Sequence, residues 1–194
     1  MRSPNDPIDV SAGIVQGHSS IIKFGYNPDV DTAASEDVWA GGGVYTGHPT
    51  GSPETVEVFS SDAADDATGT GMRTIRLYGL LTSDDTSEAT EDVTLDGTNA
   101  VDTSNTWYRI YRAQGLTYGS GGTNAGTITI RHKTTTANVF AGIQAGLGQT
   151  TIACFTIPAE TTAYLVGLFI SMGISGGGNA SADVSLRVRE FGSG

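Results

Sequence analysis

The sequence has few residues of the kinds that carry covalent or metal chemistry. Its 194 residues include one cysteine, Cys154, so a disulfide within one chain is excluded. Because Cys154 stands in an apolar run, we expect a small buried hydrophobic side chain there and not a reactive thiol. The three histidines, His18, His48 and His132, are far apart, and none has the spacing of paired metal ligands. Only a zinc site assembled in space remains open as an alternative.

Positive charge is also scarce, with 10 Lys and Arg against 21 Asp and Glu, a net charge of -11 and a pI of about 4.4. A surface of this sign repels phosphate backbones and anionic lipids, so we expect neither nucleic acid nor membrane as a partner. The most apolar run, residues 163–172, is too short to span a bilayer. Residues 1–7 lack the apolar centre of a signal peptide, so the sequence predicts no Sec-dependent export.

Long stretches with the periodicity of an amphipathic helix are absent too. Short β-branched or alternating runs are instead separated by Gly, Ser, Thr, Asn and Asp. They predict an all-β fold, a two-sheet antiparallel sandwich of jelly-roll type. Residues 137–143 are ambiguous. The expected strands are residues 13–24, 54–60, 72–81, 90–95, 100–101, 106–113, 126–132, 150–157, 163–172 and 180–189.

The two most apolar runs, residues 150–157 and 163–172, predict the central hairpin of this sandwich. Residues 163–172 are apolar at nearly every position, which indicates a strand covered on both faces. A helix is the alternative, but the β-branched and aromatic content and the internal Gly167 favour a strand. Residues 1–12, with two prolines, predict an extended N-terminal arm, and residues 13–194 a single sandwich domain.

The sequence contains no catalytic constellation, and we predict no enzyme, no cofactor and no metal site. The glycines of residues 41–43 and 69–71 lack the Lys-Ser/Thr of a phosphate loop and predict turns. Acidic side chains gather in loops, where solvated surface is the favoured interpretation and calcium ligands or paired catalytic acids are the alternatives. These acids are Asp29, Asp31, Asp62, Asp65, Asp66, Asp84, Asp85 and Glu88.

The aromatics that could stack on a sugar are Trp39, Tyr45, Trp107, Tyr108 and Tyr111. Trp107 and Tyr108 point to opposite faces of their expected strand, so at least one should be in the core.

Five segments without catalytic motifs are spread over most of the chain: residues 23–32 (KFGYNPDVDT), 36–45 (EDVWAGGGVY), 119–131, 157–159 and 182–186. With them the chain resembles virion structural proteins of tailed bacteriophages, especially marine ones. The resemblance implies a capsid decoration, or cement, protein on the head surface of the virion, made in the host bacterial cytoplasm. Its expected partners are the major capsid protein and copies of itself, as a trimer or dimer. Relatives of this kind continue with further strands, so the resemblance leaves two alternatives to a complete sheet: an incomplete sandwich, or a C-terminal end that was cut or replaced.

The arm and the loop of residues 26–45 are the expected capsid contacts. The residues that we expect in this contact are Ile8, Val10, Tyr26, Asn27, Pro28, Trp39 and Tyr45. One alternative keeps the virion but moves the site, to a tail or head-fibre module that binds host-surface glycans through aromatic and Asp-rich loops. A carbohydrate-active enzyme or lectin is the alternative from a different class.

Overall fold

The computed structural model describes residues 7–31, 34–47, 52–173 and 181–188. The chain divides into two compact units, one of Ile22–Thr161 and the other of Met1–Ile21 with Thr162–Gly194. All the strands that the described residues form belong to the first unit, and helix α1 (Pro7–Ser11) belongs to the second. The predicted division at residue 12 stays a prediction, because a contact unit is not by itself an independently folding domain.

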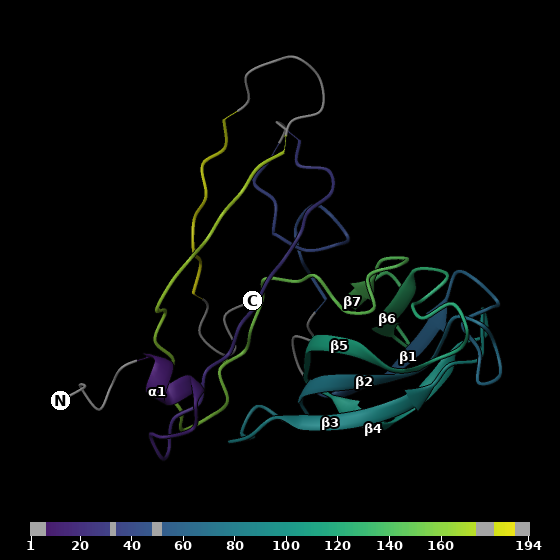
Figure 1. The fold of residues 1–194 in the computed structure, drawn as a ribbon, viewed down its shortest axis with the longest axis horizontal. Helices are drawn as coiled ribbons and strands as arrows, with labels where there is room; N and C mark the ends of the chain where they lie inside the picture. The colour runs from purple at the N-terminus through teal and green to yellow at the C-terminus, as the bar shows by residue number, and fades with distance from the viewer. Residues whose placement is uncertain (1–6, 32–33, 48–51, 174–180, 189–194) are drawn as a thin grey trace. The chain divides into compact units, whose positions relative to one another are not determined.

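The unit Ile22–Thr161 is a sandwich of two packed antiparallel sheets, which confirms the predicted all-β class (Figure 1). One sheet has the strand order β4-β1-β6-β7 and the other β3-β2-β5. The strands are β1 (Glu54–Ser60), β2 (Met72–Leu80), β3 (Ala89–Thr94), β4 (Val101–Trp107), β5 (Arg109–Tyr118), β6 (Ile128–His132) and β7 (Val139–Ile143).

Alternation along the strands builds the core between the sheets. In β1, Val56 and Val58 are fully buried, and from the other sheet Ile75 of β2 is buried against the same cluster. Between the two valines, Glu57 faces outward and accepts a hydrogen bond from Arg131 Nε of β6 at 2.6 Å. The inward side chains thus bury apolar surface while the outward ones pair across strands.

The predicted strand of residues 106–113 is in fact two strands in different sheets. β4 ends at Trp107 and β5 begins at Arg109, so that Tyr108 alone carries the chain from one sheet to the other. Its backbone N–H donates to Leu80 O at 2.9 Å. Trp107 and Tyr108 are both buried, which confirms that at least one of them is in the core.

The predicted central hairpin of residues 150–157 and 163–172 is wrong. The first run forms only an isolated antiparallel bridge, between Ile152 and Trp39, and the second forms no strand. Phe169 in the second run is 98% exposed. The place beside β6 is taken by β7, which the sequence left ambiguous, and with it the core is filled without residues 163–172.

Other expected elements at the ends of the chain also differ. Residues 13–24 and 181–188 form no strand, so the first and last predicted strands are wrong. The predicted arm is not extended where the structure describes it, because Pro7–Ser11 is a short helix of 5 residues. Residues 1–6 and the C-terminal end, 189–194, lie outside the described residues. Within the described ranges, no helix has the length and apolar character needed to cross a bilayer.

Candidate interaction surface

The described residues of the loop 26–45 form no helix or strand, and side chains hold them in shape. Glu36 is at its centre. Its Oε2 accepts from Asn27 Nδ2 at 2.7 Å and from the Gly43 N–H at 3.2 Å, and its Oε1 accepts from the Asp31 N–H at 3.3 Å. The hydrogen bond from Asn27 is the main cause that lowers the pKa of Glu36. The carboxylate is therefore charged at neutral pH and joins the two ends of the loop.

A turn of three glycines closes the far side of this loop. Gly42 and Gly43 have φ angles of 68° and 62°, which favour glycine, and this confirms the turn predicted for residues 41–43. The carbonyl of Gly43 accepts from the Asp37 N–H at 2.9 Å and from Trp39 Nε1 at 3.2 Å. The turn thus fixes the indole of Trp39 over the loop.

Tyr45 anchors the loop to the sandwich. Its hydroxyl donates to Phe140 O of β7 at 2.5 Å, and its backbone N–H donates to Asp37 Oδ2 at 2.8 Å. Its ring lies edge-on to Trp39, with the centroids 5.1 Å apart. Burial raises the pKa of Tyr45 well above its usual value, so the hydroxyl stays protonated and keeps donating.

The segment of residues 151–153, predicted as a core strand, lies along this loop instead. The Ala153 N–H donates to Val38 O at 2.9 Å, and the Tyr26 N–H donates to Thr151 O at 3.4 Å. These residues therefore support the loop of residues 26–45 and do not form the predicted core strand. The adjacent cysteine, Cys154, is half-buried and not fully buried as expected.

The chain entering the loop is tied to β5 by Lys23. Its ammonium donates to the backbone oxygen of Tyr111 and lies 5.8 Å from the centroid of the Tyr111 ring. Burial lowers the pKa of Lys23 to about 8. The ring of Tyr111 packs in turn on Phe155, with centroids 4.7 Å apart. Both ends of the loop are thus attached to the sandwich.

On this fixed loop several large apolar side chains face solvent. Tyr26, Val30, Val38 and Val44 are exposed, and Tyr26 and Val44 each have about half of their surface accessible. Exposed apolar side chains on a rigid, polar-bonded frame are typical of a surface that binds another protein.

The structure brings five of the seven expected contact residues together on the loop and leaves two elsewhere. Of the five, Tyr26 and Pro28 are exposed, while Trp39 is half-buried and Tyr45 is buried as an anchor. Ile8 and Val10 lie on helix α1 in the other unit; Ile8 is exposed and Val10 half-buried. Whether any of these residues touches a partner stays a prediction.

Sequence reasoning missed several residues of this surface. Glu36 and Asp37 hold the loop, and Val38 and Val44 add to what it exposes. The only signal in the sequence is an acidic pair placed just before an aromatic residue and a run of glycines.

Among the loop acids, Asp65 is the exception to the predicted solvated surface. It is fully buried. Its Oδ2 accepts from Ser60 Oγ at 2.6 Å and the Gly126 N–H at 2.8 Å, and its Oδ1 from the N–H groups of Met72 at 2.7 Å and Ala125 at 2.8 Å. Burial alone raises the pKa of Asp65, but these hydrogen bonds outweigh it and hold the pKa below its usual range. The carboxylate joins three parts of the sandwich and has no capacity left for a metal ion.

His132 is likewise a structural residue. Its Nδ1 lies 2.8 Å from Glu54 Oε2, its Nε2 lies 3.0 Å from Gly47 O, and its ring stacks on Phe140 with centroids 4.5 Å apart. Both ring nitrogens thus have an oxygen partner, and the ring joins β6 to the start of β1 and to Gly47. In the part of the chain that the structure describes, no three His, Cys, Asp or Glu side chains come together as metal ligands.

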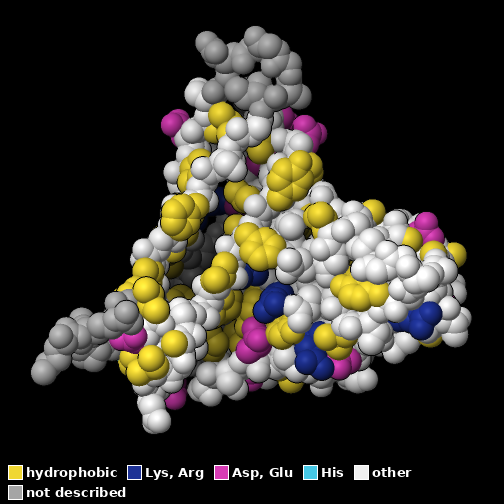
Figure 2. Space-filling model, in the orientation of Figure 1, with side chains coloured by type: hydrophobic (Ala, Val, Ile, Leu, Met, Phe, Trp, Pro, Cys, Tyr) yellow, Lys and Arg dark blue, Asp and Glu magenta, His cyan; other side chains and the backbone are white. Residues whose placement is uncertain are grey.

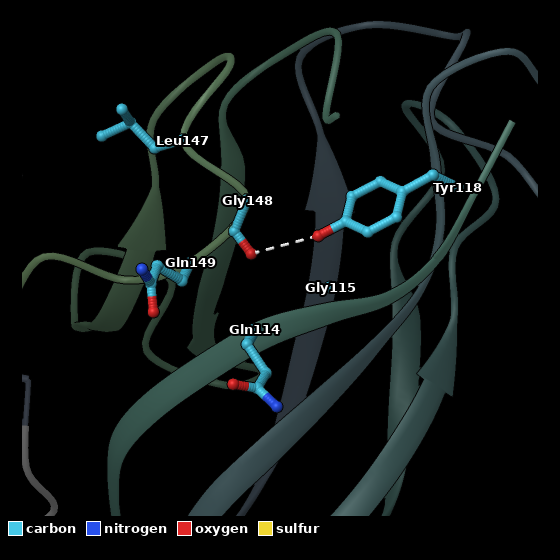
Figure 3. Close-up of a pocket in the computed structure, with 6 residues that line it drawn as sticks. All are labelled: Gln114, Gly115, Tyr118, Leu147, Gly148 and Gln149. Atoms are coloured by element: carbon cyan, nitrogen blue, oxygen red, sulfur yellow. Dashed lines mark hydrogen bonds between the residues drawn. The ribbon is translucent and has the colours of Figure 1, made fainter. Parts of the chain in front are cut away.

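A small polar hollow of about 250 Å³ lies between β5 and the turn that follows β7 (Figure 3). Figure 3 shows the Tyr118 hydroxyl directed at the Gly148 oxygen, 3.5 Å away, and the Gln114 amide turned away from both. That amide already donates to the Tyr78 hydroxyl at 2.7 Å and accepts from Arg112. The hollow is smaller than typical ligand pockets, and the Gln114 amide and the Tyr118 hydroxyl on its wall already have partners, so we do not interpret it as a ligand site.

The geometry defines a class, an all-β sandwich that carries a hydrogen-bonded loop with exposed apolar side chains. Comparison of the chain with models of known families found no match, and comparisons with curated proteins and with solved structures found none either.

Proposed function

We propose that this protein is a virion structural protein of a tailed bacteriophage, which binds the outer capsid surface and cements the head by bridging capsomers. It acts by binding and not by catalysis, with the major capsid protein as its partner. The observation that carries the proposal is the loop of residues 26–45, which exposes apolar side chains on a frame fixed to the sandwich. The sequence resemblance to virion proteins supports the same function.

The rigidity of the loop matters for this function. A loop already fixed by Glu36, Asp37 and Tyr45 loses little conformational entropy on docking. Four side chains such as Tyr26 and Val44 each contribute roughly 1.5–3 kcal/mol when fully buried, before the cost of association. A single copy would bind moderately, and associated copies would bind more tightly through avidity.

The charge supports a place outside the head. A chain with a net charge of -11 is repelled by packed DNA and would be disfavoured on the inner capsid surface. The proposal includes the jelly-roll form of the sandwich, contact through the N-terminal arm of residues 1–12, and self-association as a dimer or trimer. Bridging needs at least two contacts per assembly, which self-association would supply.

The test is removal from heads and reconstitution. Heads stripped of the protein should lose resistance to heat or osmotic shock, and added protein should restore it. A Val38→Ser/Val44→Ser variant should restore less, because it removes exposed apolar surface without touching the loop's hydrogen bonds. Leu147→Ser, at an exposed apolar side chain of the same unit outside residues 26–45, is the matched control. Unchanged resistance on removal of the protein would contradict the proposal.

A tail or head-fibre module that binds host glycans is the second candidate, favoured by the exposed ring of Tyr26. The number of copies per particle separates the two, because on the order of hundreds point to cement and about a dozen or fewer to a tail. A glycan array with the Tyr26→Ala variant as control would test the second candidate directly.

A further inference from the structure

Residues 163–172 form the most apolar segment of the chain and are uncovered. Together with residues 181–188 of the same unit they expose ten large apolar side chains, among them Phe169 at 98% and Val188 at 83%. Figure 2 shows hydrophobic side chains along the extended traces that Figure 1 draws in yellow-green and yellow. A monomeric protein rarely leaves a patch of this extent open to water.

The backbone of this segment has no partner among the residues that the structure describes. Between described residues, no backbone hydrogen bond is formed by residues 163–172. An extended, β-branched and aromatic segment with unpaired N–H and C=O groups is a template for another strand. A strand satisfies both the apolar side chains and the backbone, whereas a lipid surface satisfies only the side chains.

Charge favours a second copy of this chain as the source of that strand. Residues 161–173 contain no charged residue, although the whole chain carries -11. Two copies repel each other over most of their surface, and this segment is a place where they meet without that cost.

The neighbouring segment is complementary to itself. If two copies of residues 181–188 pair antiparallel about Ser185, Asp183 lies opposite the partner's Arg187 and Val184 opposite the partner's Leu186. Opposite charges and apolar pairs then face each other across the strands. A parallel arrangement would bring like charges together, so a two-fold, isologous dimer is favoured over a parallel trimer.

The available area is adequate for such a dimer. Full burial of a Val, Leu, Ile or Phe side chain removes roughly 60–120 Å² of apolar surface. Ten side chains that are on average about two-thirds exposed give at most roughly 400–800 Å² for each copy, reached when both faces of the paired strands are covered. A stable interface of standard size buries about 800 Å² per partner, with smaller ones near 600 Å².

We propose that two copies of this chain associate as a two-fold dimer by antiparallel strand pairing through residues 163–172 and 181–188. The inference deepens the proposed function and rests on it only for the expectation that copies associate. The dimer would present two loops of residues 26–45, one from each copy, and so provide the two contacts that bridging requires.

The test is the mass of the full chain in solution, by sedimentation equilibrium up to about 100 µM. A concentration-dependent dimer is expected. Leu165→Asp/Phe169→Asp should weaken it at least about tenfold, because like charges would meet in the interface. Leu147→Asp is the matched control, and the fluorescence of the two tryptophans, both in Ile22–Thr161, reports whether the sandwich is intact.

The register has its own test. Arg187→Asp should weaken the dimer, and the double reversal Asp183→Arg/Arg187→Asp should restore it. A monomer at every concentration, an oligomer insensitive to the changes at Leu165 and Phe169, or a failed double reversal would each overturn the proposal. Binding to stripped heads is measured separately. A monomer that still binds heads refutes the dimer alone, and a dimer that does not bind them refutes the capsid function alone.

Discussion

Strand β7 and residues 163–172 have similar sequences and opposite surroundings. VFAGI of β7 pairs with β6 and buries Phe140 completely, whereas the segment AYLVGLFISM has no strand partner and exposes Phe169. The apolar character of a segment therefore predicts that its side chains are buried, but it does not predict which part of the protein or which partner buries them. The turn before β7 is short and returns the chain directly to β6, so β7 is covered within the sandwich. Residues 163–172 lie in the other unit, which has no strand of its own among the described residues.

The largest effect is expected at the buried carboxylate of Asp65, which contributes to the stability of the sandwich. Asp65→Ala should lower the free energy of unfolding by about 3–5 kcal/mol, because four donors lose their charged acceptor in a buried place. Urea unfolding followed by tryptophan fluorescence measures this. Asp84→Ala, at an exposed loop acid, should change the free energy by less than about 0.5 kcal/mol. Equal losses in the two variants would show that Asp65 is not the tie described above.

A matched pair of isoleucines addresses the comparison directly. Ile130 of β6 is fully buried and Ile170 is 57% exposed. Ile130→Ala should lower the unfolding free energy of the sandwich by about 2–5 kcal/mol through the cavity it leaves. Ile170→Ala should leave it within about 0.5 kcal/mol. The same urea experiment applies, and a large loss at Ile170 would mean that residues 163–172 cover the sandwich after all.

A smaller effect is expected where the loop joins the sandwich. Tyr45→Phe removes the hydroxyl that donates to Phe140 O and should cost about 1 kcal/mol. Hydrogen exchange of the loop amides should become faster. Tyr164→Phe, at an exposed tyrosine of the other unit, is the control and should change neither quantity. Unchanged exchange in Tyr45→Phe would place the anchor of the loop elsewhere.

The smallest effect concerns pH and the shape of the loop. An unfolded glutamate titrates at about 4.3, and the folded pKa of Glu36 is lower. The stabilisation by the Glu36 carboxylate is therefore fully present above the unfolded pKa and is lost as the pH falls through the lower, folded pKa. The amide signal of Gly43, followed by NMR between about pH 6 and 2, should move as the carboxylate is protonated. In Glu36→Gln this step should be absent, and its persistence would assign it to another acid.

The strands of the sandwich could be predicted because their alternation depends on short-range sequence. β1, β2, β3 and β6 were expected nearly at their observed bounds, since each has one buried and one outward face. The division at Tyr108 could not be predicted, because a continuous aromatic run contains no sign that the chain changes sheet. The exposed state of residues 163–172 could not be predicted either, since their pattern matches that of a covered strand.

The loop of residues 26–45 could be predicted from the sequence, but its internal contacts could not. Residues 26–45 were expected to be a polar loop with aromatics, but its shape depends on which side chains meet. The contacts of Glu36 with Asn27 and of Tyr45 with Phe140 join residues 9 and 95 positions apart, and spacing along the chain does not encode them. The burial of Tyr45 goes with its contact to Phe140, which the sequence does not reveal.

Tyr108, the one residue that connects β4 in one sheet to β5 in the other, limits where the chain can be lengthened. One residue inserted there would turn every side chain of β5 to the opposite side and disrupt both layers. The turn at residues 119–124 is different: Gly122 has a φ of 72°, and no atom lies within 4 Å of the position its Cβ would occupy. The open space would accommodate a foreign peptide inserted after Gly122, with Gly122 itself kept because its positive φ favours glycine, which makes that turn a suitable site for displaying an epitope or an affinity tag.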